Sequence, residues 1–139
     1  SAWTPSLDWI SVLCSRNNIF TVGIGDGGNE VGMGNFVTEI CNIRPEFRKC
    51  LSVIRTDVTI PVDVSNWGCY ALSTALSCIW REWLGPGKND ERSMLEALIE
   101  KKAVDGISKK SELTVDGFEI DVHEGIISEL YEIWNKYSS

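Results

Sequence analysis

The chain has 139 residues, of which 43% are hydrophobic and 24% are charged, a composition that is typical of a folded globular domain and unlike collagen, coiled coils or disordered chains. Its 13 Lys and Arg against 20 Asp and Glu give a net charge of −7, which would repel a nucleic-acid backbone. No apolar run approaches the ~20 residues of a membrane-spanning helix, and the first residues lack the pattern of a signal peptide. We expect one domain over residues 1–139, with no nucleic-acid or membrane partner.

The first half of the chain alternates helical and strand patterns. In order, it predicts a helix at 5–17, a strand at 19–24, a helix around 36–40, and strands at 51–54 and 58–62. The run at 19–24 is almost continuously apolar, which is typical of an interior strand covered on both faces. Pro61 has no N–H to donate, so it keeps the strand at 58–62 out of a fully paired central position.

The second half is mainly helical. A long amphipathic helix begins at Ser65-Asn66 and ends before Gly85-Pro86-Gly87, and a second helix begins at Asp90 with Met94, Leu95, Leu98 and Ile99 facing inward. A short strand at 112–115 lies between two Asp-Gly turns, and residues 123–137 form the last predicted helix. Strands that alternate with helices predict a layered α/β fold with an at least partly parallel sheet flanked by helices.

The cysteines and the single histidine restrict the metal chemistry. Five cysteines, at positions 14, 41, 50, 69 and 78, form no Cys-x-x-Cys pair, so we expect reduced, mostly buried thiols rather than a disulfide framework or a zinc site. His123 is the only histidine, and we interpret it as a surface or helix-capping residue. Any metal would therefore be a hard cation held by oxygen ligands.

The segment Val22-Gly-Ile-Gly-Asp-Gly-Gly-Asn-Glu-Val-Gly-Met-Gly-Asn35 carries the strongest functional signal. A strand that ends in glycines lets backbone N–H groups converge and lets a ligand approach closely. Gly23, Gly25 and Gly28 satisfy the Gly-x-Gly-x-x-Gly spacing, but Asp26 and Glu30 would repel a dinucleotide pyrophosphate. The mixture of carboxylates and N–H donors suits a ligand that has both carboxylate and ammonium groups.

Structural roles are the alternative for this segment. Glycines form tight turns, Asp26 or Asn29 can cap a helix, and Glu30 can be a first-turn acid favoured by the helix dipole. Six glycines within the twelve residues 23–34 cost helix and strand propensity, at roughly 1 kcal/mol each in a helix. That cost favours a functional interpretation.

A second strand-to-helix junction is Asp63-Val-Ser-Asn-Trp-Gly68. Like the first junction, it has polar side chains between a strand and the helix that follows. Ligands of α/β sheets bind at the edge formed by the carboxyl ends of the strands, so we expect both junctions to face one pocket. Asn66 is equally consistent with a helix cap and with a ligand contact. Asp57 either points to the same edge or is a solvated or Arg55-paired carboxylate, and Thr114 and Asp116 are either turn residues or pocket-rim residues.

Three motifs in this order resemble the D-glutamate cyclase family, whose eukaryotic members are mitochondrial. They are Gly23-Ile-Gly-Asp-Gly-Gly-Asn-Glu-Val-Gly-Met-Gly-Asn35, Val64-Ser-Asn-Trp-Gly-Cys-Tyr-Ala-Leu72, and Ala103-Val-Asp-Gly with Thr114-Val-Asp-Gly117. The resemblance covers nearly the whole chain and corresponds to the C-terminal part of the family's full-length protein. It implies a hydro-lyase that converts D-glutamate to 5-oxo-D-proline and water, located in the mitochondrial matrix in a eukaryote and in the cytoplasm otherwise.

This reaction requires a base for the ammonium group and neutralisation of the side-chain carboxylate. We assign catalytic roles to Asp26, Glu30 and Asp116: Asp26 or Glu30 as the base for the amine, and Asp116 as the group that binds the ammonium or releases water. The residues expected to bind substrate are Gly25, Gly27, Gly28, Asn29, Asn66 and Thr114. No cofactor is required in principle, although Asp26 and Glu30 would suit a divalent cation such as Mg²⁺ or Mn²⁺.

Two other functions stay open on sequence grounds. The glycine-rich segment would also serve a nucleotide- or phosphate-binding module. The second alternative is a non-catalytic interaction domain. Such a domain would form a homo-oligomer or dock onto the N-terminal part of the family's longer protein.

Overall fold

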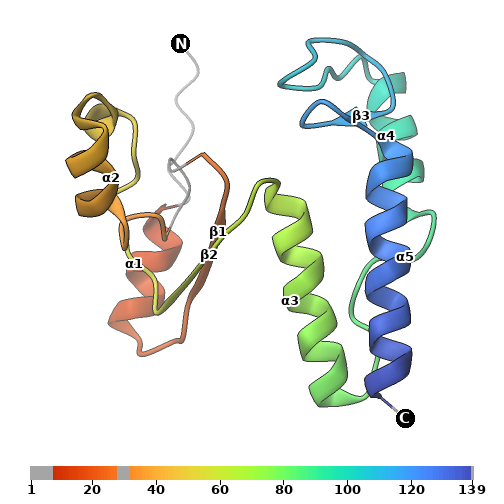
Figure 1. Ribbon diagram of the computed structural model, residues 1–139, viewed down its shortest axis with the longest axis horizontal. Helices are drawn as coiled ribbons and strands as arrows, with labels where there is room; N and C mark the ends of the chain where they lie inside the picture. The colour runs from red at the N-terminus through yellow and green to blue at the C-terminus, as the bar shows by residue number, and fades with distance from the viewer. Residues whose placement is uncertain (1–7, 28–31, 139) are drawn as a thin grey trace. The chain divides into compact units, whose positions relative to one another are not determined.

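The computed structural model describes residues 8–27 and 32–138. The chain divides into two compact units, residues 1–68 and 69–139. Figure 1 shows the elements of each unit. In the described residues, α-helices and one parallel strand pair confirm the predicted α/β class with a partly parallel sheet.

The first unit is built around the parallel pair β1 (Val22–Gly25) and β2 (Val58–Pro61). The two strands are joined through α2 (Val37–Ile43) and the 3₁₀ helix η1 (Pro45–Lys49), and α1 (Asp8–Arg16) precedes β1. Val22 lies opposite Val58 and Gly25 lies opposite Pro61. The N–H groups of Val58 and Val62 donate to the Thr21 and Gly25 carbonyl oxygens, so the pairing with β1 does not need the N–H that Pro61 lacks.

Two strand predictions in this unit are partly wrong. β1 begins at Val22 rather than Ile19, and the side chains of Ile19 and Phe20 are 55% and 70% exposed. β1 pairs with a single strand among the described residues, and Val22 is 38% exposed, so the run at 19–24 is not an interior strand. Residues 51–54 form no strand either; their neighbour Arg55 makes isolated bridges to Gly32 and Met33.

Close contacts with neighbouring segments explain two of the glycines. Gly32 has a φ of +98°, and a Cβ there would lie 2.8 Å from the Gly23 Cα and 2.7 Å from Thr56 Oγ1. A Cβ on Gly68 would lie 2.6 Å from Ile24 Cγ2 and 2.9 Å from Val62 Cγ1. All four distances are too short for a Cβ atom, so only glycine fits at either position.

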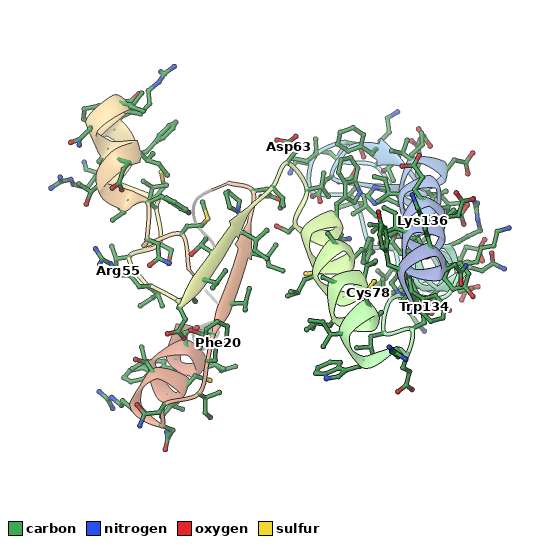
Figure 2. The ribbon with its side chains drawn as sticks, turned by 60° about the horizontal axis from the view of Figure 1, so that its bottom comes forward. Phe20, Arg55, Asp63, Cys78, Trp134 and Lys136 are labelled. Atoms are coloured by element: carbon green, nitrogen blue, oxygen red, sulfur yellow. The ribbon has the colours of Figure 1, made fainter. Side chains whose placement is uncertain are left out.

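Helix α3 (Ser65–Trp80) begins where the sequence predicts, and the boundary between the units falls within it. The second unit adds α4 (Asp90–Glu100), the antiparallel hairpin β3 (Thr114–Val115) and β4 (Phe118–Glu119), and α5 (Ile120–Tyr137). Figure 2 shows the side chains, including Cys78 on α3 and Trp134 on α5. Of the residues predicted to face inward from α4, Met94 and Leu98 are instead 56% and 45% exposed.

An arginine clamp joins α4 to α5. Arg92 Nε and Nη2 donate to the two carboxylate oxygens of Glu124, each at 2.7 Å, and Nη2 also donates to Asp121 Oδ1 at 2.7 Å. The two parallel bonds to Glu124 fix both the distance and the orientation of the helices. These bonds raise the pKa of Arg92 and lower the pKa of Glu124.

The cysteine prediction is half right. All five cysteines are free of disulfides, as expected. Cys41 is buried, whereas Cys50 and Cys69 are exposed, so the thiols are not mostly buried. None of the helices in the part of the chain that the structure describes is both long and apolar enough to span a membrane.

Candidate functional site: an acidic corner at the sheet edge

The two predicted junctions of the first unit meet through a side-chain contact. Asp26 Oδ2 accepts a hydrogen bond from the backbone N–H of Ser65 at 3.1 Å and another from Ser65 Oγ at 2.9 Å. The two residues are 39 positions apart in the sequence. The glycine-rich segment and the Ser-Asn-Trp segment therefore share one corner of the molecule, which we call the acidic corner and define by Asp26, Ser65 and Asn66.

The parallel register of the sheet produces this corner. Asp26 directly follows the last residue of β1, and Ser65 comes four residues after the end of β2. The Val62 N–H donates to the Gly25 carbonyl oxygen at 3.0 Å, so the pairing extends just past the strands on the same edge. The carboxyl ends of parallel strands meet at one edge, which is where ligands bind in α/β folds.

Asp26 also has a structural role. Ser65 is the first residue of α3, so the carboxylate satisfies a backbone N–H that has no acceptor within the helix. The positive end of the helix dipole stabilises a negative charge at this place. Asp26 is exposed and Asn66 is half-buried, which leaves the corner open to a solute.

The structure places some of the other predicted loop residues. Gly25 is buried at the end of β1, and Gly27 is exposed beside Asp26. Gly28, Asn29 and Glu30 lie outside the described residues, so the predicted roles of these three residues stay predictions. The same holds for the cation site predicted at Asp26 and Glu30. Among the described residues, no group of three or more His, Cys, Asp or Glu side chains is arranged to hold a metal ion.

A polar cluster holds the far end of the glycine-rich segment in place. Asn35 Nδ2 donates to the Thr56 carbonyl oxygen at 2.8 Å and to Thr59 Oγ1 at 2.6 Å. Thr59 Oγ1 in turn donates to the Gly32 carbonyl oxygen at 2.8 Å. The Gly32 and Gly34 N–H groups both donate to the Ile54 carbonyl oxygen, at 3.0 and 3.1 Å. Both ends of the segment are thus tied to residues around β2.

Asp57 does not belong to the acidic corner, contrary to one of the two interpretations above. It precedes β2, so it lies at the amino end of the strands, where its Oδ2 accepts bonds from the Thr21 N–H at 2.7 Å and from Thr21 Oγ1 at 2.8 Å. These bonds, first of all the one from the hydroxyl, lower the pKa of Asp57. The residue fastens the start of β1 to the start of β2.

Thr114 and Asp116 come together in the second unit. Thr114 is buried on β3, and Asp116 occupies the exposed hairpin turn with a φ of +52°, followed by Gly117 at +83°. Both line a cavity of about 180 Å³ next to the end of α4. Asp116 is therefore a turn residue that also lines this cavity, and the substrate-site roles of Thr114 and Asp116 stay predictions.

Asp105 organises this hairpin, a role that was not predicted from the sequence. Asp105 Oδ1 accepts from the Ile107 N–H at 2.9 Å, and Oδ2 accepts from Thr114 Oγ1 and from the Gly117 N–H, both at 2.9 Å. The bond from Ile107 contributes most to holding the pKa of Asp105 well below its usual range. The Asp-Gly pair at 105–106 was a signal for this role, because aspartate often bonds the backbone two residues further on.

The predicted surface or capping position of His123 is wrong. Its side chain is fully buried rather than on the surface, at the start of α5. Nδ1 lies 3.7 Å from Glu91 Oε2 of α4, and Nε2 lies 3.2 Å from the Val115 carbonyl oxygen of β3. The ring therefore joins two helices and the hairpin, and serves the packing of this unit rather than a cap.

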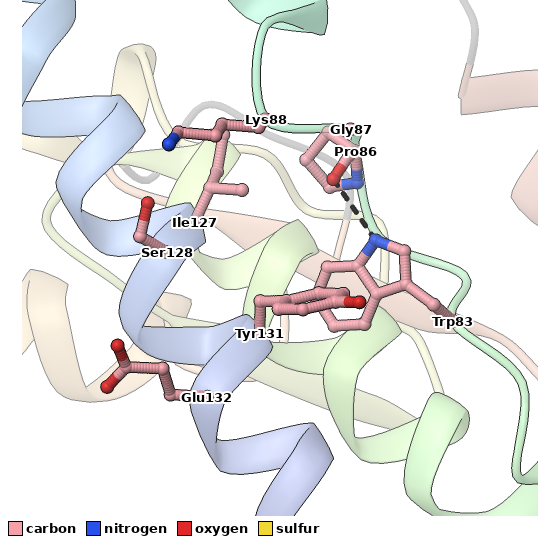
Figure 3. Close-up of a pocket in the computed structure, with 8 residues that line it drawn as sticks. All are labelled: Trp83, Pro86, Gly87, Lys88, Ile127, Ser128, Tyr131 and Glu132. Atoms are coloured by element: carbon pink, nitrogen blue, oxygen red, sulfur yellow. Dashed lines mark hydrogen bonds between the residues drawn. The ribbon is translucent and has the colours of Figure 1, made fainter.

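A further pocket of the second unit has a volume of about 490 Å³ (Figure 3). One wall is the connection after α3, where Trp83 Nε1 donates to the Pro86 carbonyl oxygen at 3.1 Å. The opposite wall is α5, where Tyr131 meets the Trp83 ring edge-on with 5.1 Å between ring centroids. None of the predicted site residues lines this pocket.

Comparison with known proteins identifies the family. Residues 1–131 match the family described as D-glutamate cyclase-like, C-terminal. The chain belongs to this family. Human "D-glutamate cyclase, mitochondrial" is similar to it, with 27% identity over 139 aligned positions that cover 83% of this chain and 23% of the human protein. This D-glutamate cyclase-like chain thus spans about a quarter of the curated relative that it matches.

Proposed function

We propose that the protein converts D-glutamate to 5-oxo-D-proline and water, in the mitochondrial matrix if it comes from a eukaryote and in the cytoplasm otherwise. The α-amine attacks the carbon of the side-chain carboxylate, a C–N bond forms, a C–O bond breaks, and the oxygen leaves as water after gaining two protons. No electrons are transferred, so the reaction needs no redox cofactor. The family match and the name of the human relative support this proposal.

The acidic corner is the observation that carries the proposal. The ammonium group of glutamate must lose a proton before it can attack, and the exposed Asp26 carboxylate is an acceptor held in a fixed orientation by Ser65. The amide of the neighbouring Asn66 is suited to binding a substrate carboxylate. Holding both ends of the substrate in a folded conformation would supply much of the rate, because ring closure is fast once the groups are oriented.

The remaining predicted residues have complementary roles in the proposal. Glu30 is a second candidate for the base, and the backbone N–H groups of the glycine-rich segment would stabilise the oxyanion of the tetrahedral intermediate. A divalent cation held by Asp26 and Glu30 would do the same, in which case a chelator would abolish turnover.

The experiment measures the loss of D-glutamate and L-glutamate, and the formation of 5-oxoproline, by the full natural protein. Asp26→Asn should lower kcat by about 10²–10⁴-fold, the usual contribution of a positioned general base. Asp63→Asn is the matched control, because Asp63 is an exposed carboxylate on the connection between β2 and α3, two residues before Ser65. The proposal fails if no 5-oxoproline forms, or if both variants retain the wild-type rate.

A further inference from the structure

The first unit has a pocket that is rich in hydrogen-bond donors. It has a volume of about 430 Å³ and lies between α1 and the segment that leads into β2. Its lining residues are Ser11, Val12, Ser15, Arg16, Val53, Ile54 and Arg55. Ser11 and Ser15, like Val12 and Arg16, are four positions apart, so they lie on one face of α1. A volume of this size is within the range of small-molecule sites.

The charges in this pocket are all of one sign. Arg16 and Arg55 line it, whereas no carboxylate side chain does so among the described residues. Two of the other arginines have acidic partners: Arg44 pairs with Glu46 at 3.5 Å, and Arg92 pairs with Glu124 at 2.7 Å. Within the described part of the chain, neither Arg16 nor Arg55 makes an ion pair. Because Arg16 and Arg55 line the same pocket and no described carboxylate does, a bound anion would be attracted to both charges.

We propose that this pocket binds an oxyanion, a carboxylate or a phosphate group, on a molecule with a small apolar part. A guanidinium group presents a planar fork of N–H donors that matches the oxygens of carboxylates and phosphates. The hydroxyl groups of Ser11 and Ser15 add two further donors on the α1 side. Val12, Val53 and Ile54 provide an apolar wall, and Val53 is 70% exposed.

The pocket is distinct from the acidic corner. Arg55 precedes β2, whereas Asp26 follows the carboxyl end of β1. In a parallel pair these positions are at opposite ends of the strands, and Figure 2 shows Arg55 and Asp63 at the two ends of β2. An anion bound by Arg55 therefore occupies a second site, which stands independently of the proposed cyclase reaction.

The experiment titrates the full natural protein with inorganic phosphate and, separately, with acetate at constant ionic strength. Binding is followed by calorimetry and by the chemical shifts of the arginine Nε–H groups. The variants are Arg16→Gln and Arg55→Gln. Arg48→Gln is the matched control, because Arg48 is an exposed arginine of η1 that does not line the pocket.

We expect saturable binding of at least one probe, about tenfold weaker in each pocket variant, which corresponds to about 1.4 kcal/mol, and unchanged in Arg48→Gln. Preference for phosphate or for acetate identifies which class of oxyanion the site takes. Absence of saturable binding by both probes, or equal binding in all variants, would overturn the proposal. D-glutamate turnover is measured in the same variants, so failure of this site is distinguishable from failure of the acidic corner.

Discussion

Removal of the Asp105 carboxylate should destabilise the second unit. Asp105 accepts three hydrogen bonds, from the Ile107 N–H, from Thr114 Oγ1 and from the Gly117 N–H, each at 2.9 Å. A hydrogen bond to a charged group contributes about 1.5–3 kcal/mol. Loss of the bond has most of this cost only where water cannot take the place of the missing acceptor. Only the Thr114 donor is buried, at 6% exposure. We therefore expect Asp105→Ala to lower the free energy of unfolding by about 2–3 kcal/mol.

The pH dependence of this effect has a definite sign. The folded state holds the pKa of Asp105 below its ordinary value, first through the Ile107 N–H. A depressed carboxyl pKa adds stability above the pKa of the unfolded state, about 3.9, and that stability is lost as the pH falls toward the folded-state pKa. The difference between the wild type and Asp105→Ala should therefore be constant from pH 7 to about pH 5 and shrink below about pH 4.

The assay is urea unfolding followed by tryptophan fluorescence, at pH 7 and at pH values below 4. Asp116→Asn serves as the control, because it removes a neighbouring exposed carboxylate in a turn conformation that asparagine also tolerates. A pH-independent difference, or equal stability of the wild type and Asp105→Ala at pH 7, would refute the role assigned to Asp105.

Two further predictions concern stability. Gly34→Ala should lower the free energy of unfolding of the first unit by more than about 1 kcal/mol, because a Cβ there would lie 2.5 Å from the Val53 carbonyl carbon and oxygen. Gly106→Ala is the control, because the space at its Cβ position is open, and it should leave thermal unfolding nearly unchanged. Equal melting temperatures of the two variants would contradict this packing. Arg92→Lys should lower the melting temperature of the second unit although it keeps the charge, because lysine cannot form the two parallel bonds to Glu124. A melting temperature equal to that of the wild type would show that the positive charge alone is sufficient.

Local patterns predicted the elements that depend on local chemistry. The start of α3 at Ser65 follows from the capping residues there, and the α/β class follows from the alternation of strands and helices. The strand expected at 58–62 is β2, which ends one residue earlier, at Pro61. The acidic corner was also predictable in part, because the carboxyl ends of parallel strands share an edge. The contact between Asp26 and Ser65 confirms that the two junctions meet.

Features that depend on distant neighbours were not predictable. The run at 19–24 has the composition of an interior strand, but an interior position requires a partner strand on each side, and the sequence of the run does not show how many strands pair with it. No sequence pattern around His123 indicates that it is buried. Its ring contacts Glu91 and the Val115 carbonyl oxygen, which are 32 and 8 positions away in the sequence. Asp105 showed a turn signal, but its bond to Thr114 depends on the fold of the intervening loop.

The most direct test of the proposed function follows the atoms of the substrate. D-glutamate labelled with ¹⁵N at the amine and ¹³C at the side-chain carboxylate is incubated with the full natural protein and with its Asp26→Asn variant, and the product is analysed by NMR. The account predicts a one-bond ¹⁵N–¹³C coupling in 5-oxo-D-proline formed by the wild type, and loss of that product in the variant. Unchanged substrate with the wild type, or the same coupled product formed at the same rate by Asp26→Asn, would contradict it.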